Sequence, residues 1–364
     1  MIKVLYVNGG PMRRGGIESF MMNNFRNIDS RKVHIDFAVR DGEDGAYDSE
    51  ILNSGSQIIT LPLRSRHPVR YVRILAKALK DGKYEVVHSQ MDAMNGLVLF
   101  VAKLCRVPIR ISHSHNTSAL TRNPIKRVAQ SISKTLINIS ATDLMACSHA
   151  AGEWLYGKSC NFQVIPNAID TSRFTFNNAL RTRTRIHENL EDSTVIGCIG
   201  RFDYQKNQEF LIHVMNGLRD NPRNFKLVLV GDGKDKSTVQ AMVEQFDLQD
   251  VVLFVKSTSK VENWYNAFDI FVMPSRFEGL SVAAIEAQTN GLKCLFSDRV
   301  SDEVRITKQV SFLPIDDPAN WVSRLETCDT RRLQDAERIV GAAGYSIEQE
   351  ASMLERYYLS RAKF

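Results

Sequence analysis

Short apolar runs alternate with amphipathic segments along the first half of the chain. The apolar runs predict strands at residues 3–8, 33–39, 57–61, 86–88, 108–113, 141–147 and 163–165. Apolar positions at helical spacing predict a helix that begins near Ile17, and further helices at residues 69–79 and 95–105. Strands that alternate with helices in this way indicate a parallel sheet with crossover helices.

The same pattern restarts near residue 194. Strands are expected at residues 194–200, 226–230, 251–255, 270–273 and 293–296, and helices at 208–216, 239–246, 261–268, 281–288 and 347–358. The polar segment 171–192 reads as a linker. We therefore expect an α/β protein with two Rossmann-like parallel-sheet domains that face each other across a cleft.

The expected domain bounds follow from this repeat. Residues 1–170 form an N-terminal domain, residues 171–345 form a C-terminal domain, and residues 346–364 form a closing helix. A chain of 364 residues with 43% apolar and 24% charged residues can supply two cores of a soluble globular protein.

Charge divides the chain unevenly. Residues 1–169 carry 22 Lys and Arg against 13 Asp and Glu, whereas residues 170–364 carry 25 against 28. A basic first half suggests an anionic partner: nucleic acid, anionic lipid head groups or a pyrophosphate-linked substrate. Nucleic acid is not expected, because no basic recognition helix, zinc finger or RNA-binding aromatic motif is present.

The cysteines and the N-terminus indicate a cytoplasmic protein. None of the six cysteines belongs to a C-x-x-C pair, so neither a zinc site nor a disulfide framework is expected. The segment MIKVLYVNGG reads as a strand and a glycine turn and lacks the pattern of a secretory signal. No apolar stretch approaches the ~20 residues of a membrane-spanning helix.

Two cations stand in the loop GRFDYQKN, which follows an apolar strand and precedes a helix. Arg201 can bind phosphate through two nitrogens, and Lys206 adds a compact positive charge. Together with the N-terminus of the next helix they could hold a diphosphate without a metal ion. The alternative is two solvated loop cations.

Two glutamates eight residues apart lie in PSRFEGLSVAAIEAQTNG. Glu278 is expected in the turn before a helix and Glu286 inside that helix, where they could bind sugar hydroxyls and a ribose diol. The backbone amides of Gly279, Leu280 and Ser281 face outward from the helix start and could receive an anion. Alternatively, Glu278 is an ordinary acid at a helix N-terminus and Glu286 a surface charge.

Glycines and histidines mark two loops of the first half. The pair Gly15–Gly16 opens a helix and allows close approach of a phosphate or sugar, or forms a simple flexible turn. Neither a dinucleotide fingerprint nor a Walker motif is present, which argues against NAD or ATP. In SHSHN, His113 and His115 share one face if the strand continues. A structural role is expected over metal binding, for which no third ligand is apparent, and the alternative is a hydrogen bond to a sugar hydroxyl.

Two basic clusters suggest a surface that lies on an anionic membrane. They comprise Arg64, Arg66, Arg70 and Arg73, and then Arg122, Lys126, Arg127 and Lys134 within an amphipathic stretch. The alternative is an ordinary solvated helix face.

Read in order, these motifs resemble one family. GGIE, S-H-N, IPNAID, GRFDYQKN, LVGDG and FEGLSVAAIE are similar to the retaining enzymes of glycosyltransferase family 4 over nearly the whole chain. Within that family the SHSHN run and the segment 294–304 look most like the EpsF/CapM type of exopolysaccharide and capsule assembly. Lys256 departs from the family pattern, which has glycine at this position.

The resemblance implies a GT-B fold, with the acceptor on the N-terminal domain and the nucleotide sugar on the C-terminal one. It implies that Arg201 and Lys206 stabilise the leaving diphosphate, that Glu278 contacts the donor sugar, and that Glu286 contacts the ribose. The remaining implied site residues are His115 near the donor sugar and Gly16 near the phosphates. The closing helix would cross back to the N-terminal domain.

The expected activity is transfer of a sugar, with retention, from a UDP-sugar to a lipid-linked exopolysaccharide, capsule or other surface glycan precursor. No metal or other cofactor is expected, and the enzyme would be cytoplasmic, with peripheral contact at the inner face of the cell membrane. Two alternatives are a sugar-nucleotide epimerase of the same fold and a non-catalytic scaffold that binds a sugar nucleotide.

Overall fold

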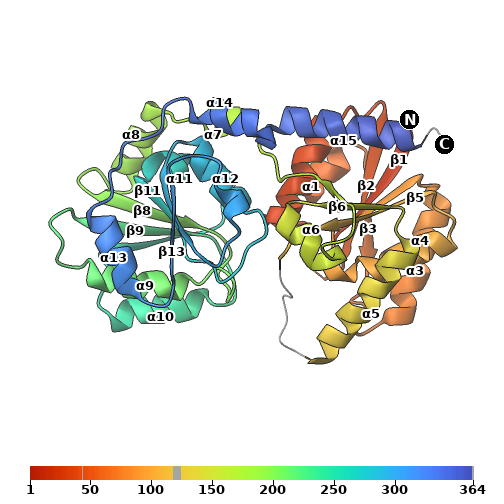
Figure 1. Ribbon diagram of the computed structural model, residues 1–364, viewed down its shortest axis with the longest axis horizontal. Coiled ribbons are helices and arrows are strands. Elements are labelled where there is room, and N and C mark those ends of the chain that lie inside the picture. The colour runs from red at the N-terminus through yellow and green to blue at the C-terminus, as the bar shows by residue number, and fades with distance from the viewer. Residues whose placement is uncertain (43, 118–123, 363–364) are drawn as a thin grey trace. The chain divides into compact units, whose positions relative to one another are not determined.

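The computed structural model describes residues 1–42, 44–117 and 124–362, and the chain forms two compact units. Unit 1 contains residues 1–168 and 347–364, and unit 2 contains residues 169–346. Each unit is built on one parallel sheet between two layers of helices (Figure 1), which confirms the predicted α/β class.

Unit 1 has a seven-stranded sheet in the order β3-β2-β1-β4-β5-β6-β7. Its strands are β1 (Ile2–Val7), β2 (Val33–Arg40), β3 (Ile58–Leu61), β4 (Val86–Ser89), β5 (Ile109–Ser114), β6 (Asp143–Ala146) and β7 (Gln163–Val164). Its helices are α1 (Gly16–Asn27), α2 (Asp48–Asn53), α3 (Pro68–Gly82), η1 (Asp92–Met94), α4 (Asn95–Leu104), α5 (Pro124–Ser140), α6 (His149–Tyr156) and α15 (Ile347–Arg361).

Alternate residues of the central strands enter different cores of unit 1. Val4 and Tyr6 of β1 pack with α1 and α15, whereas Leu5 and Val7 pack with α3 and α4. Both faces of the sheet are therefore covered, as expected of parallel strands that are apolar on both sides.

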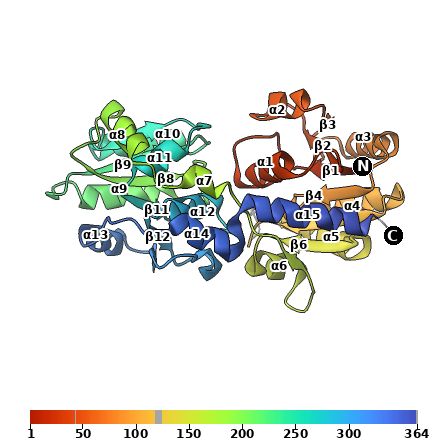
Figure 2. The same ribbon diagram turned by 90° about the horizontal axis from the view of Figure 1, so that it is seen from above.

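The C-terminal helix α15 lies beside α1 (Figure 1, Figure 2). Its buried Glu350 accepts hydrogen bonds from Asn24 Nδ2 (2.8 Å) and from the backbone N–H of Ala168 (3.1 Å). Further along the helix, the buried Tyr358 hydroxyl lies 2.7 Å from Nδ1 of His88. These contacts attach α15 to α1, to the segment that follows β7, and to β4 in the middle of the sheet.

Unit 2 has a six-stranded sheet in the order β10-β9-β8-β11-β12-β13. Its strands are β8 (Thr194–Ile199), β9 (Phe225–Val230), β10 (Val252–Val255), β11 (Ile270–Met273), β12 (Lys293–Ser297) and β13 (Val310–Leu313). Its helices are α7 (Thr171–Phe174), α8 (Asn178–His187), α9 (Gln208–Gly217), α10 (Lys236–Gln245), α11 (Glu262–Ala267), α12 (Val282–Thr289), η2 (Asp302–Val304), α13 (Pro318–Glu326), α14 (Ala336–Val340) and η3 (Gly341–Tyr345).

Residues 171–192 are not a linker, contrary to the interpretation of their polar sequence. They form α7 and α8, and α8 packs against α11. The polar residues are needed for packing here, because the buried Arg185 donates to the carbonyl of Ala267 (2.9 Å) and to Asp269 (3.0 Å). Hydrophobic periodicity cannot reveal a helix whose inward face binds through guanidinium groups.

We expect Glu350 to make the stability of unit 1 depend on pH. Burial raises its pKa from the ordinary 4.5 to about 8. The folded chain thus holds this proton more tightly than the unfolded one, and the corresponding stabilisation is complete below pH 4.5 and lost as pH rises through 8. Melting temperatures between pH 5 and 9 should fall less for Glu350→Gln than for the wild type. The exposed Glu348→Gln on the same helix should follow the wild type, and parallel curves for all three would contradict the assignment.

Candidate active site

Two loops meet at the carboxyl edge of the unit 2 sheet. Strands β8 and β11 are neighbours and parallel, so the loop after Ile199 and the turn after Met273 leave the sheet side by side. The backbone N–H of Arg276 donates to the carbonyl of Gln205 (2.8 Å), and Asn207 Nδ2 donates to the carbonyl of Pro274 (3.0 Å). These bonds join the two motifs that the sequence singled out.

Lys206 and Glu278 form an ion pair in this place. The ammonium nitrogen lies 2.6 Å from Oε1 of Glu278, and the side chains are only 19% and 7% exposed. Gln205 Nε2 lies 3.4 Å from the other oxygen of Glu278. A charged pair removed from water in this way costs desolvation energy, which good geometry and further hydrogen bonds must offset.

Arg201 lies in the same loop but reaches outward. Its side chain is 63% exposed, and Nε donates to Asp203 (2.7 Å). Close packing with the next loop shapes this segment, because a Cβ on Gly231 would stand 2.1 Å from the carbonyl oxygen of Gly200. The guanidinium therefore extends from a firmly packed loop and remains accessible to an anion.

The turn before α12 contains the three amides that the sequence marked as anion donors. Gly279, Leu280 and Ser281 are buried, and Ser281 is the N-cap residue of α12 with no side-chain capping bond. Their backbone leads directly from Glu278 into the helix that contains Glu286.

Glu286 lies in α12, partly exposed, and accepts a hydrogen bond from the Tyr265 hydroxyl (2.7 Å). Burial raises the pKa of Glu286 to about 7, and the bond from Tyr265 opposes that rise. The sequence did not mark Tyr265 as a site residue, since a tyrosine beside a tryptophan in a short helix reads as core.

In unit 1, His113 lies in β5 and His115 directly follows it, and their side chains share one side, as the alternation of a continuing strand predicts. Their rings stack with centroids 4.3 Å apart, and His113 is fully buried whereas His115 is 6% exposed. The His115 Nε2 forms a hydrogen bond with the side-chain amide of Gln90, at 2.6 Å from Oε1. Burial lowers the pKa of His115 to about 3, so the ring is neutral and acts through hydrogen bonds.

Asp92 holds the loop after β5 and was not predicted. Its Oδ1 accepts from the backbone N–H groups of His115 (2.5 Å) and Asn116 (3.2 Å), and its Oδ2 accepts from Asn116 Nδ2 (2.6 Å). Its backbone has a φ of 49°, a left-handed conformation that is uncommon outside glycine. Gly16, the other candidate in unit 1, is the first residue of α1, with no atom near its Cβ position.

The basic clusters of unit 1 have different environments. Lys134 is not a free surface cation, because it donates to the carbonyl of Trp154 (2.8 Å) and lies over its ring. Arg66, Arg70 and Arg73 are exposed, and Arg64 is partly buried. The remaining candidates lie outside the described residues or side chains: Arg122, Lys126 and Arg127.

Among the described residues, no group of three His, Cys, Asp or Glu side chains is placed as metal ligands would be. No described helix is long and apolar enough to cross a bilayer.

The two parallel-sheet units define the GT-B class of glycosyltransferase folds. HepE of Anabaena in complex with UDP superposes with a TM-score of 0.78 at 16% identity, covering 99% of this chain and 100% of that one. Two family profiles match: "Glycosyltransferase Family 4" over residues 14–173 and "Glycosyl transferases group 1" over residues 181–310.

Curated relatives give the family. The protein EpsF of Bacillus subtilis (strain 168) is 32% identical over 98% of this chain and 96% of its own length. The UDP-Gal:alpha-D-GlcNAc-diphosphoundecaprenol alpha-1,3-galactosyltransferase of Escherichia coli is 26% identical over 62% of this chain and 60% of its own. The chain therefore belongs to the family 4 and group 1 glycosyltransferases, as its motifs predicted.

We expect Asp92→Ala to lower the melting temperature by several degrees. The substitution removes three hydrogen bonds, from the buried N–H of His115 and from the partly buried N–H and side-chain amide of Asn116, together about 2–4 kcal/mol of unfolding free energy. Alanine keeps the Cβ that Asp92 already has at a φ of 49°, so Asp92→Ala isolates the loss of the bonds. Glycine tolerates that φ, so Asp92→Gly should cost less than Asp92→Ala. Unchanged thermal melting of both variants would show that the loop after β5 does not depend on Asp92.

Proposed function

We propose that this glycosyltransferase transfers a sugar, with retention and without a metal ion, from a UDP-sugar to a lipid-linked precursor of an exopolysaccharide, capsule or other surface glycan. The observation that carries the proposal is the Lys206–Glu278 pair beside the exposed Arg201. Two cations and one carboxylate at the carboxyl edge of a parallel sheet fit a diphosphate and a sugar hydroxyl.

In this proposal the donor rearranges the ion pair. The diphosphate takes Lys206 and Arg201 as partners, and Glu278 then accepts hydrogen bonds from the donor sugar. As the bond between the anomeric carbon and the β-phosphate oxygen breaks, negative charge grows on the diphosphate. Fixed cations stabilise that charge more in this transition state than in the ground state, which is how they accelerate the reaction.

The acceptor hydroxyl attacks on the face from which the diphosphate leaves, so the anomeric configuration is retained. Its proton passes to a phosphate oxygen of the leaving group. The neutral His115 and the helix start at Gly16 are proposed to serve the donor sugar and its phosphates, as the resemblance implies. Glu286 is proposed to bind the ribose, and the amides of residues 279–281 to complete the donor site.

The relatives support the choice of substrates. The name of the E. coli relative specifies UDP-galactose as donor and a diphosphoundecaprenol-linked acceptor, and HepE was crystallised with UDP. By analogy we propose uridine as the nucleoside here and a pyrophosphate-linked lipid as the anchor of the acceptor. The basic composition of the first half agrees with an anionic lipid partner.

A lipid-linked acceptor requires access to a membrane, and α5 provides an apolar stripe. Val128, Ile132 and Ile139 are 61%, 59% and 52% exposed, and spacings of four and seven residues put them on one helix face. Helix α5 packs on α4, which in turn contacts α3 with its exposed arginines. We propose that this part of unit 1 makes peripheral contact with the anionic inner face of the cell membrane.

The donor proposal is tested by UDP release from the purified protein. A panel of UDP-sugars, with GDP-mannose for comparison, is supplied with a membrane lipid extract as acceptor source and with EDTA. One UDP-sugar should give release that depends on the extract and persists in EDTA. Lys206→Ala should lower the turnover number roughly 100-fold, since removing one preorganised donor to a transition-state anion costs about that much.

Lys308→Ala is the matched control, because Lys308 is exposed and precedes β13, at the opposite edge of the same sheet. Unchanged turnover in Lys206→Ala would overturn the mechanism. A free epimer as product would indicate the epimerase, and UDP binding without turnover of any donor would favour the scaffold.

The membrane proposal is tested by co-sedimentation with vesicles. The protein should bind phosphatidylglycerol vesicles and release them at high salt, because the attraction is partly electrostatic. Ile132→Glu should weaken binding several-fold. Ile186 lies on α8 and is 56% exposed, and Ile186→Glu should leave binding unchanged. Equal binding of both variants would exclude α5 as the contact.

A further inference from the structure

Glu286 is directed by a single hydroxyl group. Tyr265 Oη lies 2.7 Å from Oε2 of Glu286 and 3.2 Å from the carbonyl of Ala283. A phenol has one proton, and the shorter contact to a carboxylate is the stronger bond. The Tyr265 hydroxyl therefore occupies Oε2, and Oε1 is the oxygen of Glu286 left to meet a ligand.

Tyr265 itself has little freedom. It is fully buried, and its ring packs against the rings of Phe174 (5.7 Å), Phe268 (6.1 Å) and Phe271 (5.7 Å). Edge and tilted contacts on several sides hold the ring in one orientation. The direction of Glu286 is consequently set by the placement of α11, the short helix that contains Tyr265.

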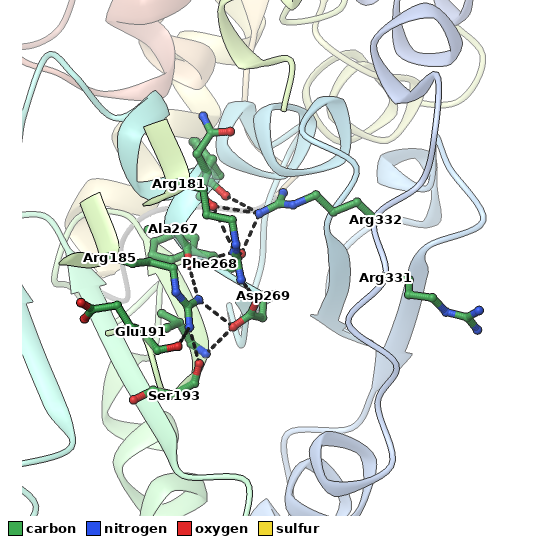
Figure 3. Close-up of polar contacts among 12 residues, drawn as sticks. Arg181, Arg185, Glu191, Ser193, Ala267, Phe268, Asp269, Arg331 and Arg332 are labelled. Atoms are coloured by element: carbon green, nitrogen blue, oxygen red, sulfur yellow. Dashed lines mark hydrogen bonds and ion pairs between the residues drawn. The ribbon is translucent and has the colours of Figure 1, made fainter. Parts of the chain in front are cut away.

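Arginine side chains fix the C-terminal end of α11 (Figure 3). Arg332 donates to the carbonyls of Tyr265 (3.2 Å), Asn266 (3.0 Å) and Phe268 (2.7 Å). Arg181 donates to the carbonyl of Phe268 (2.9 Å) and pairs with Asp269 (2.5 Å). These carbonyls end a helix and would otherwise lack partners.

Arg332 also joins α11 to α12. It donates to the carbonyl of Asn290, the C-cap residue of α12, at 3.0 Å. One guanidinium thus bridges the ends of the two helices that contain Tyr265 and Glu286. Removing this charge from water costs desolvation free energy, because burial and the nearby Arg181 lower the pKa of Arg332 to about 9. In return, the Arg332 guanidinium fixes the position of α11 relative to α12.

We propose that Tyr265 and Arg332 are positioning residues for nucleotide binding, which act through Glu286: Tyr265 orients the carboxylate, and Arg332 holds the helix of Tyr265 against that of Glu286. This inference rests on the proposed function, in which Glu286 receives the ribose hydroxyls. Neither residue touches the substrate, so their loss should weaken recognition of the ribose and leave binding of the rest of the nucleotide intact.

The test compares the dissociation constants of UDP and 2′,3′-dideoxy-UDP by calorimetry. The wild type should prefer UDP. Tyr265→Phe should weaken UDP binding roughly tenfold, the usual order for a lost hydrogen bond to a charged group, and leave dideoxy-UDP binding nearly unchanged. Arg332→Gln should reduce the preference in the same way, and a merely structural loss would weaken both ligands alike.

Arg331→Gln is the matched control. Arg331 is the neighbouring residue, its side chain is 89% exposed and pairs with Asp329, and it points away from the cluster (Figure 3). It should keep the wild-type preference. Thermal melting identifies any variant that fails to fold, and Tyr265→Phe, which removes one oxygen atom, then decides the question.

Glu286→Gln distinguishes failure of the positioning role from failure of the proposed ribose site. If Glu286→Gln lowers the preference and Tyr265→Phe does not, the positioning role is wrong and the proposed donor site stands. If the wild type shows no preference, or Glu286→Gln retains it, the placement of the ribose at Glu286 fails, and this inference fails with it.

Discussion

The parallel pairing of β8 with β11 is the constraint on which the candidate donor site depends. These strands are separated by two others in the chain but are neighbours in the sheet, and both end at the same edge. Lys206 and Glu278 are thereby brought to 2.6 Å although 72 residues separate them in the sequence. Each neutralises the other in a place where an isolated charge would be costly. In the proposed reaction a diphosphate would take Lys206 as its partner, and sugar hydroxyls would donate hydrogen bonds to Glu278 as the pair separates.

The arginines of unit 2 show how environment divides one residue type between two uses. Arg201 extends from a packed loop into solvent and remains available to an anion. At the other edge of the sheet, Arg185 is buried, and its guanidinium donates to backbone carbonyls and to Asp269. The first placement favours ligand binding and the second favours fixed geometry. The two arginines have the same side-chain chemistry, so the position of each in the backbone decides which role it has.

In unit 1 a row of buried, neutral polar side chains leads to the loop after β5, which contains His115. Tyr358 contacts His88 at 2.7 Å, and Nε2 of His88 lies 3.0 Å from Nδ1 of His113, which stacks on His115. Burial lowers the pKa of all three histidines, so they contribute hydrogen bonds and shape without charge. The last helix of the chain thus takes part in the interior that supports the loop after β5.

The sequence by itself determined most of the alternating strands and helices, the two parallel sheets and the family, because apolar periodicity and short motifs are local properties of the chain. The last strand of unit 2, β13, was not predicted. Locality also explains the errors: residues 171–192 were read as a linker, since α8 packs through arginine rather than through apolar residues. Asp92 and Tyr265 carried no local signal at all. Only the tertiary structure decided that Asp92 holds the loop of His115, that Tyr265 meets Glu286, and that Lys206 pairs with Glu278. Each of these contacts joins residues from different elements, and strand order and helix packing bring them within bonding distance.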